Sequence, residues 1–204
     1  MLAVRLLRET LTFDITDVID CAVGKGGHSQ AFLSKGKNVT GIDFGPSYLR
    51  HSNYNHIQKP LEEVELDPVD LVWSCHTLEH VNNVGVMLTK FREWLKPGGY
   101  LALAVPPNQS DRLHIGHVSL WTLAHLMYNL IINGWDCSDA KWYTEDYDIG
   151  VLLQKTDDID FQDRTTMLNE MAWLNKYMPI EVDHKSDSWW PDNWHEETGP
   201  RRTV

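Results

Sequence analysis

The chain has 204 residues, which suits one domain of ordinary size, and 42% of them are apolar, enough for a sizeable core. Acidic residues outnumber basic ones by 29 to 18, so the formal net charge is −11. That charge repels polyanions and disfavours nucleic acid as a partner. No apolar run approaches the roughly 20 residues of a membrane helix, and the start lacks a signal-peptide pattern. We therefore expect a cytoplasmic protein that does not enter a membrane.

Cysteine and tryptophan usage add two expectations. The three cysteines, Cys21, Cys75 and Cys137, are far apart and odd in number, so we expect free thiols in a reducing compartment. Nine tryptophans are many for this length, and three of them fall in the last sixteen positions. Core packing with a docked tail explains most of them, and flat faces for stacking a sugar are the alternative.

Short apolar runs alternate with longer helical segments, which is typical of βαβ units around a parallel sheet. In chain order the first half predicts a strand at 17–23, a helix at 27–35, a strand at 38–44, a short helix at 46–52, and strands at 55–59 and 69–75. The second half predicts a helix at 83–95 that ends at Lys96-Pro97-Gly98-Gly99, a strand at 100–105, an amphipathic helix at 119–133, and strands at 135–144 and 149–154.

The C-terminal part differs in composition from the rest of the chain. Residues 161–178 predict an extra helix after the last strand, and from Pro179 the sequence is polar and aromatic with little periodicity. We therefore divide the chain into a nucleotide-binding type of domain over 1–160 and a C-terminal helix with an aromatic-rich tail or lid over 161–204.

A glycine-rich loop follows the first predicted strand and leads into the first helix. It contains Gly24, Gly26 and Gly27, and glycines there allow a tight turn and close approach of a ligand to main-chain N–H groups. Asp43 ends the second strand about 20 residues later, where a carboxylate can accept hydrogen bonds from both ribose hydroxyls of a nucleoside. The pair predicts a site for an adenosine cofactor.

With this pair in place, the segment from about 17 to about 155 resembles class I S-adenosylmethionine-dependent methyltransferases of the small, single-domain kind. The resemblance is carried by VIDCAVGKGG, VTGIDFGPSYL, VDLVWSCHTLEHV and LTKFREWLKPGGYLALAVP. It implies an α/β fold with a doubly wound, mostly parallel seven-stranded sheet, one antiparallel edge strand and helices on both faces. The cofactor-binding positions that it implies are Asp20, Ala22, Gly24, Gly26, Asp43, Phe44, Leu61, Ser74 and Cys75.

The sequence departs from the family pattern at three places. Ala22 stands where the first motif glycine is expected, and Lys59-Pro60-Leu61 stands where an acid or polar group usually lies beside the adenine. The segment before the first strand is short, so we expect another part of the chain, such as the tail, to cover the cofactor.

Three ligand-type side chains, His76, Glu79 and His80, follow the fourth predicted strand. The spacing also occurs in inverted zinc proteases, but those need a helix and this motif leaves a buried strand. Three interpretations stay open: loop-stabilising hydrogen bonds, general-base catalysis by a histidine with an ordinary pKa of about 6.5, or a divalent metal (Mg, Mn or Zn). The metal interpretation comes from similarity to ubiquinone-pathway O-methyltransferases and assigns His76, Glu79 and His80 as its ligands.

The loop from Asn108 to His117 follows the fifth predicted strand, where the family places its acceptor-binding residues. Asp111, His114 and His117 are its acid–base candidates, so the catalytic set is His80, His117, His76 and Asp111.

Together these features predict O-methylation of a small polar acceptor, with a sugar or glycan hydroxyl favoured; the oligomeric state stays open. N- or C-methylation of a metabolite, a catalytically silent binding module, and a different nucleotide enzyme such as a dehydrogenase are the alternatives.

Overall fold

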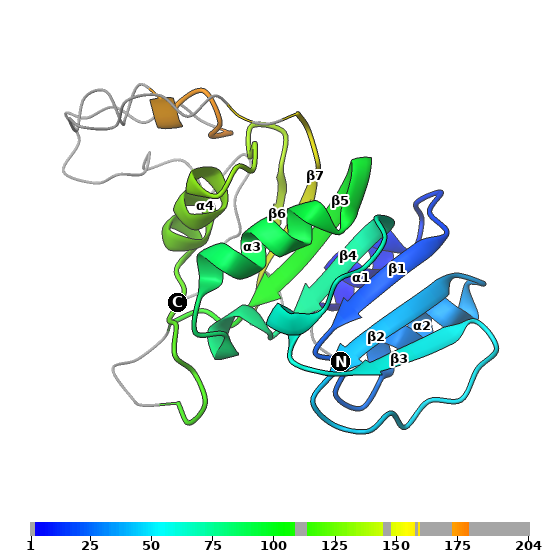
Figure 1. The fold of residues 1–204 in the computed structure, drawn as a ribbon. Coiled ribbons are helices and arrows are strands. Elements are labelled where there is room, and N and C mark those ends of the chain that lie inside the picture. Colours follow the sequence, from blue (N-terminus) through cyan, green and yellow to red (C-terminus); the bar gives the residue numbers. More distant parts are fainter. Residues whose placement is uncertain (1–2, 109–113, 145–147, 158, 160–172, 180–204) are drawn as a thin grey trace.

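A seven-stranded sheet organises the part of the chain that the computed structural model describes, namely residues 3–108, 114–144, 148–157, 159 and 173–179. The strands are β1 (Asp17–Cys21), β2 (Asn38–Asp43), β3 (Tyr54–Gln58), β4 (Val69–Cys75), β5 (Leu95–Val105), β6 (Lys141–Tyr143) and β7 (Ile149–Gln154). Their order across the sheet is β3-β2-β1-β4-β5-β7-β6 (Figure 1).

Strands β1 to β5 are parallel to one another, and β7 runs antiparallel to both β5 and β6. The predicted α/β class and the mostly parallel seven-stranded sheet are therefore confirmed. The reversed strand, β7, is one position in from the edge, because β6 closes the sheet beyond it.

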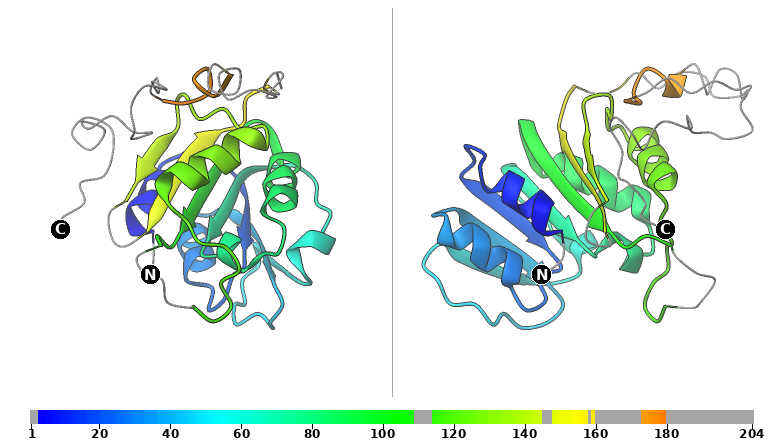
Figure 2. Two further views of the ribbon diagram at one scale, coloured as in Figure 1. Left: turned by 90° about the vertical axis from the view of Figure 1, so that its left-hand side faces the viewer. Right: turned by 180° about the vertical axis from the view of Figure 1, so that it is seen from behind.

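Helices cover both faces of the sheet. On one face lie α1 (Val4–Thr10) and α2 (Gly27–Ser34), and on the other lie α3 (Val84–Glu93) and α4 (Leu123–Ile132) (Figures 1 and 2). Alternate residues of β4 serve the two faces: Leu71 and Trp73 pack with the core on the α1–α2 side, and Val72 packs with the core on the α3–α4 side. Burial on both sides explains why VDLVWSC reads as a nearly continuous apolar run.

Side-chain caps fix where α3 and α4 begin. The Asn83 side chain accepts a hydrogen bond from the Val86 N–H at 3.1 Å, and the Thr122 hydroxyl accepts one from the His125 N–H at 3.2 Å. The helix that the sequence predicts from residue 119 starts at Leu123 in the structure. Residue Trp121 instead forms an isolated β-bridge with Pro107.

The structure differs from the sequence prediction in four elements. Helix α1 was not predicted, and no helix forms over 46–52, where the Ser47 hydroxyl bonds to the Leu49 backbone instead. Strand β5 begins at Leu95, so the Lys-Pro-Gly-Gly segment lies within a strand whose pairing with β4 is shifted between Val69 and Leu71. The strand predicted over 135–144 is limited to β6.

Most of the predicted C-terminal helix and all residues from 180 onward lie outside the described residues, so the division at 160 stays a prediction. Of the described residues there, Trp173 and Leu174 are buried in the core on the α3–α4 side. The Cys137 N–H donates to the Tyr177 carbonyl oxygen at 3.0 Å, which ties this segment to the sheet domain.

Cysteines and tryptophans of the described part belong mainly to the core. All three cysteines are free thiols, as expected, and burial raises the pKa of each. Five tryptophans are buried at 3% exposure or less, which supports core packing over ligand stacking for them: Trp73, Trp94, Trp121, Trp135 and Trp173. No helix of the described residues is both long and apolar enough to cross a membrane.

Candidate functional site

The carboxyl ends of β1, β2, β4 and β5 meet at one edge of the sheet. Strand β1 pairs with β2 on one side and with β4 on the other, so Cys21 lies opposite both Ile42 and Ser74. The strand order reverses in direction at this point. Strands β2 and β3 lie on one side of β1, and strands β4 and β5 lie on its other side. Open α/β sheets bind their ligands at such a reversal, outside the carboxyl ends of the strands.

The glycine-rich loop lies at this reversal, between β1 and α2. Ala22, Gly24 and Gly26 all adopt positive φ angles, of 56°, 53° and 79°. At Gly24 a Cβ atom would have no neighbour within 4 Å, so the backbone there faces open space that a ligand can enter. Ala22 holds the same left-handed conformation with a side chain, which is strained for a residue other than glycine.

Asp43 stands beside this loop at the end of β2. Its two carboxylate oxygens accept hydrogen bonds from the Gly24 and Gly45 N–H groups, each at 2.8 Å. Each oxygen keeps a further lone pair, and the side chain is only partly buried. The open loop and this carboxylate therefore fit the ribose of an adenosine cofactor.

Asp20, the residue before the end of β1, is buried, whereas Asp43 is only partly buried. The Asp20 carboxylate is 2% exposed and accepts a hydrogen bond from the Ser29 hydroxyl of α2 at 2.5 Å. Burial raises the pKa of Asp20 to about 7, although the Ser29 hydrogen bond opposes the rise. The structure thus makes Asp20 a residue that holds the loop against α2.

The other predicted cofactor positions are spread from the core to the surface. Leu61 is the first residue of a 3-10 turn over Leu61–Glu63, and its side chain is buried in the core. Phe44 is 73% exposed beside Asp43, as an adenine-contacting ring would be. Ser74 is fully buried, and its hydroxyl has no hydrogen-bond partner among the described residues. Cys75, at the end of β4, is half-buried.

His76 follows β4 with a positive φ of 54° and pairs with a residue that the sequence did not single out. Its Nε2 lies 2.7 Å from Oδ1 of Asp148, and its Nδ1 lies 3.3 Å from Oε1 of Glu79. Burial lowers the pKa of His76, but these two carboxylates outweigh burial and raise it to about 9. At neutral pH His76 is therefore an imidazolium, which suits structural pairing rather than the base or metal-ligand role predicted for it.

Glu79 and His80 form a 3-10 turn over Leu78–His80, and the loop after β5 docks on this turn. The Val118 N–H donates to the Glu79 carbonyl oxygen at 2.7 Å, and Nδ1 of His80 donates to the Gly116 carbonyl oxygen at 2.9 Å. The docking brings the His117 ring to 5.0 Å from the His80 ring, between centroids. Because a carbonyl only accepts, the hydrogen of neutral His80 is on Nδ1 and the lone pair is on Nε2.

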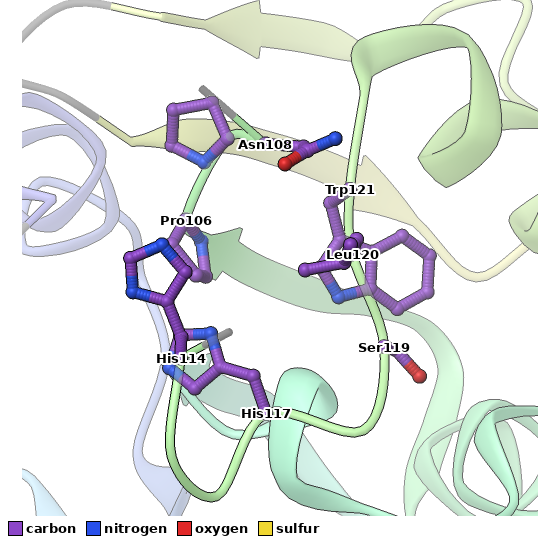
Figure 3. A pocket seen from close by; sticks show the side chains of 8 residues that line it. Pro106, Asn108, His114, His117, Ser119, Leu120 and Trp121 are labelled. Atoms are coloured by element: carbon purple, nitrogen blue, oxygen red, sulfur yellow. The ribbon is translucent and has the colours of Figure 1, made fainter. Parts of the chain in front are cut away.

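His117 also lines a small open pocket next to the end of β5. Figure 3 shows His114 and His117 on one side of this pocket and Trp121 on the other. Its lining residues are Pro106, Pro107, Asn108, His114, His117, Ser119, Leu120 and Trp121. Burial lowers the pKa of His117, so the ring is neutral at pH 7 and able to take a proton. Asp111, the fourth predicted catalytic residue, lies outside the described residues.

Comparisons with known proteins agree with this fold. Residues 19–103 match the model of a family described as a methyltransferase domain. A ribosomal RNA small subunit methyltransferase H from Gemmatimonas aurantiaca is 49% identical over 41 residues. These residues make up 20% of this chain and 13% of that protein, so the chain spans only a small part of that relative's length.

Solved structures resemble a larger part of the chain. The 1,6-didemethyltoxoflavin-N1-methyltransferase of Burkholderia thailandensis, solved with S-adenosylhomocysteine, has a TM-score of 0.64 at 19% identity, over 75% of this chain and 76% of that one. Human N-acetylserotonin methyltransferase has a TM-score of 0.59 at 17% identity, over 74% and 51% of the two chains. A putative methyltransferase of Haloferax volcanii, in complex with the activator Trm112, has a TM-score of 0.57 at 19% identity, over 86% and 83%. Residues 19–103 thus match a methyltransferase domain, and the described residues share the fold of solved S-adenosylmethionine-dependent methyltransferases.

Proposed function

We propose that the protein transfers the methyl group of S-adenosylmethionine to a hydroxyl group of a small acceptor. The observation that carries this proposal is the position of His117, a neutral histidine in the wall of the pocket beside the carboxyl edge of the sheet. S-adenosylmethionine supplies an already activated methyl group, so the protein has to align the acceptor and remove its proton.

Each part of the edge then has a task. Asp43 accepts hydrogen bonds from the ribose hydroxyls, and the loop at Gly24 lets the cofactor approach the backbone. His117, with Nε2 of His80 beside it, takes the proton of the acceptor hydroxyl.

The pocket lining supports one class of acceptor. Prolines, a leucine and a tryptophan provide apolar contact, and Asn108 and the histidines provide polar partners, which suits a compact ring with a hydroxyl substituent. A sugar hydroxyl stays one member of this class, although four of the five buried tryptophans lie in the core outside the pocket lining and offer no stacking face, namely Trp73, Trp94, Trp135 and Trp173. The net charge of −11 argues against a nucleic acid acceptor.

Calorimetry of the full chain with S-adenosylmethionine and S-adenosylhomocysteine tests the cofactor half of the proposal. We expect binding by the wild type, at least about tenfold weaker binding by Asp43→Ala because two ribose hydrogen bonds are lost, and no change for the exposed Asp139→Ala. Absence of binding to the wild type would instead support a catalytically silent module, the role that the strained Ala22 loop favours.

Release of S-adenosylhomocysteine in the presence of phenols, catechols and monosaccharides tests the acceptor half. We expect His117→Gln and His80→Gln to lower kcat while leaving the affinity for S-adenosylhomocysteine unchanged. Methylation of amines but not of hydroxyl compounds would favour N-methylation.

A further inference from the structure

We propose that Glu79, His80 and His117 form a binding site for one divalent cation of the Zn²⁺ type. Among the described residues, these three place one ligand atom each within 4.8 Å of one another. The set differs from the ligands expected from the sequence, because His117 from the docked loop takes the place of His76. The site rests on the proposed function only for its role, since His117 also lines the acceptor pocket.

The strongest observation is the side chain of Glu79. It is fully buried, and neither carboxylate oxygen has a hydrogen-bond partner among the described residues. The 3.3 Å contact with His76 is an ion pair outside hydrogen-bonding geometry. A buried carboxylate whose oxygens accept no hydrogen bond is costly even beside one ion-pair partner, and coordination of a cation lowers that cost.

The surroundings of Glu79 point the same way. Asp148 and Glu79 are both buried, and the ring of His76 lies between them, 2.7 Å from Asp148 and 3.3 Å from Glu79. The ring of His80 also lies near the Glu79 carboxylate, and His117 completes the group of three ligand atoms within 4.8 Å of one another.

His80 is arranged as a metal ligand should be. Its Nδ1 donates to the Gly116 carbonyl oxygen, which leaves the lone pair of Nε2 directed to the site. Such a hydrogen bond from the second ring nitrogen fixes the tautomer and the ring orientation of ligating histidines. Nε2 of His80 lies 3.8 Å from Oε1 of Glu79, close to the roughly 3.4 Å between two ligands at tetrahedral Zn²⁺.

The donor set selects the class of cation. Two imidazoles and one carboxylate suit Zn²⁺, Co²⁺ or Fe²⁺ and leave a coordination position open, whereas Mg²⁺ prefers oxygen ligands and retains its waters. An ion in this position would lower the pKa of an acceptor hydroxyl bound to it. With the ion bound, the lone pairs of His80 and His117 would be used for coordination, so the ion would replace these two histidines as the group that promotes loss of the hydroxyl proton.

Titration of the metal-free full chain with Co²⁺, followed by visible absorption, tests the site without any turnover. We expect d–d bands of a low-coordinate Co²⁺ at one equivalent, displacement by Zn²⁺, and no displacement by an equal concentration of Mg²⁺. His80→Gln and His117→Gln should each weaken Co²⁺ binding about 100-fold or more, because loss of an outer partner alone already costs 10- to 100-fold. The matched control is His125→Gln, an exposed histidine on α4 outside the group, which should bind Co²⁺ like the wild type.

Both substituted histidines are at least partly exposed, and circular dichroism confirms that each variant is folded. A wild type without d–d bands, or a folded His117→Gln variant with wild-type affinity, overturns the site. Calorimetry with S-adenosylhomocysteine on the same preparation separates the two proposals: binding of the nucleoside without Co²⁺ overturns the metal site alone, and binding of Co²⁺ without the nucleoside supports the metal site and overturns the proposed function.

Discussion

Nε2 of His76 lies 2.7 Å from Oδ1 of Asp148, although the two residues are 72 positions apart in the chain. Asp148 also accepts the Ala3 N–H at 2.7 Å through its other oxygen. One buried carboxylate therefore joins the end of β4, the start of β7 and the segment before α1. The pair holds His76 in a left-handed backbone conformation, where it starts the turn that carries Glu79 and His80.

We predict that Asp148→Asn lowers the free energy of unfolding by about 2 kcal/mol, because the amide keeps the shape but removes the charge that pairs with His76. Urea denaturation at neutral pH measures the change. Asp157→Asn, an exposed acid shortly after β7, serves as the control and should stay within about 0.5 kcal/mol of the wild type. Equal stability of the two variants would mean that the His76–Asp148 pair contributes nothing to folding.

Ala22 provides a second prediction, since it holds a φ of 56° that favours glycine. We expect Ala22→Gly to leave the protein as stable as the wild type or up to about 1 kcal/mol more stable, because relief of the strain offsets the greater entropy of the unfolded chain. The branched variant Ala22→Val should lose more than about 1 kcal/mol. Thermal melts of the three proteins measure these differences. An Ala22→Gly protein less stable than Ala22→Val would contradict the conformation of this loop.

Several strands, and the position of the glycine loop next to Asp43, could be predicted because their signals are local. The runs VDLVWSC and IGVLLQ are apolar on both faces of the sheet, and β4 and β7 have the predicted boundaries to within one residue or better. The glycine loop and Asp43 also follow from short motifs, since the carboxyl ends of parallel strands always meet at one edge.

The remaining features depend on contacts between distant segments. Nothing around Asp148 marks it in the sequence, because its partner His76 is supplied by the folded sheet. The grouping of His117 with Glu79 likewise depends on three hydrogen bonds between separate loops. Helix α1 has only seven residues and is stabilised by packing of Leu6 and Leu7 on the sheet, so its own periodicity is too short to predict it.

The third prediction concerns Thr77, whose hydroxyl donates to the Cys21 carbonyl oxygen at 3.1 Å and thereby joins the ends of β4 and β1. Thr77→Val has nearly the same shape but lacks the donor, so we expect a loss of about 1 kcal/mol in the free energy of unfolding. Because the hydrogen bond lies directly beneath the glycine loop, we also expect weaker binding of S-adenosylhomocysteine. Urea denaturation and calorimetry measure the two effects, and Thr89→Val, on the exposed side of α3, is the matched control. Unchanged stability and affinity in Thr77→Val would show that the two strand ends hold their positions without this bond.

The last prediction follows from the pKa of Asp20, which burial raises from an ordinary value of 3.8 to about 7. Between these two values the folded protein keeps a proton on Asp20 that the unfolded chain has released, so the contribution of Asp20 to the free energy of unfolding falls as the pH rises from about 4 to about 7 and is flat beyond. Asp20→Asn cannot ionise, and its amide oxygen can still accept the Ser29 hydroxyl. The variant should therefore match the wild type near pH 4 and exceed its stability at about pH 8, by at most about 4 kcal/mol.

Urea denaturation of both proteins across this range isolates the effect, because the other titrating groups are common to both. Two curves that run parallel from about pH 4 to pH 8 would mean that Asp20 is ionised in the folded protein throughout.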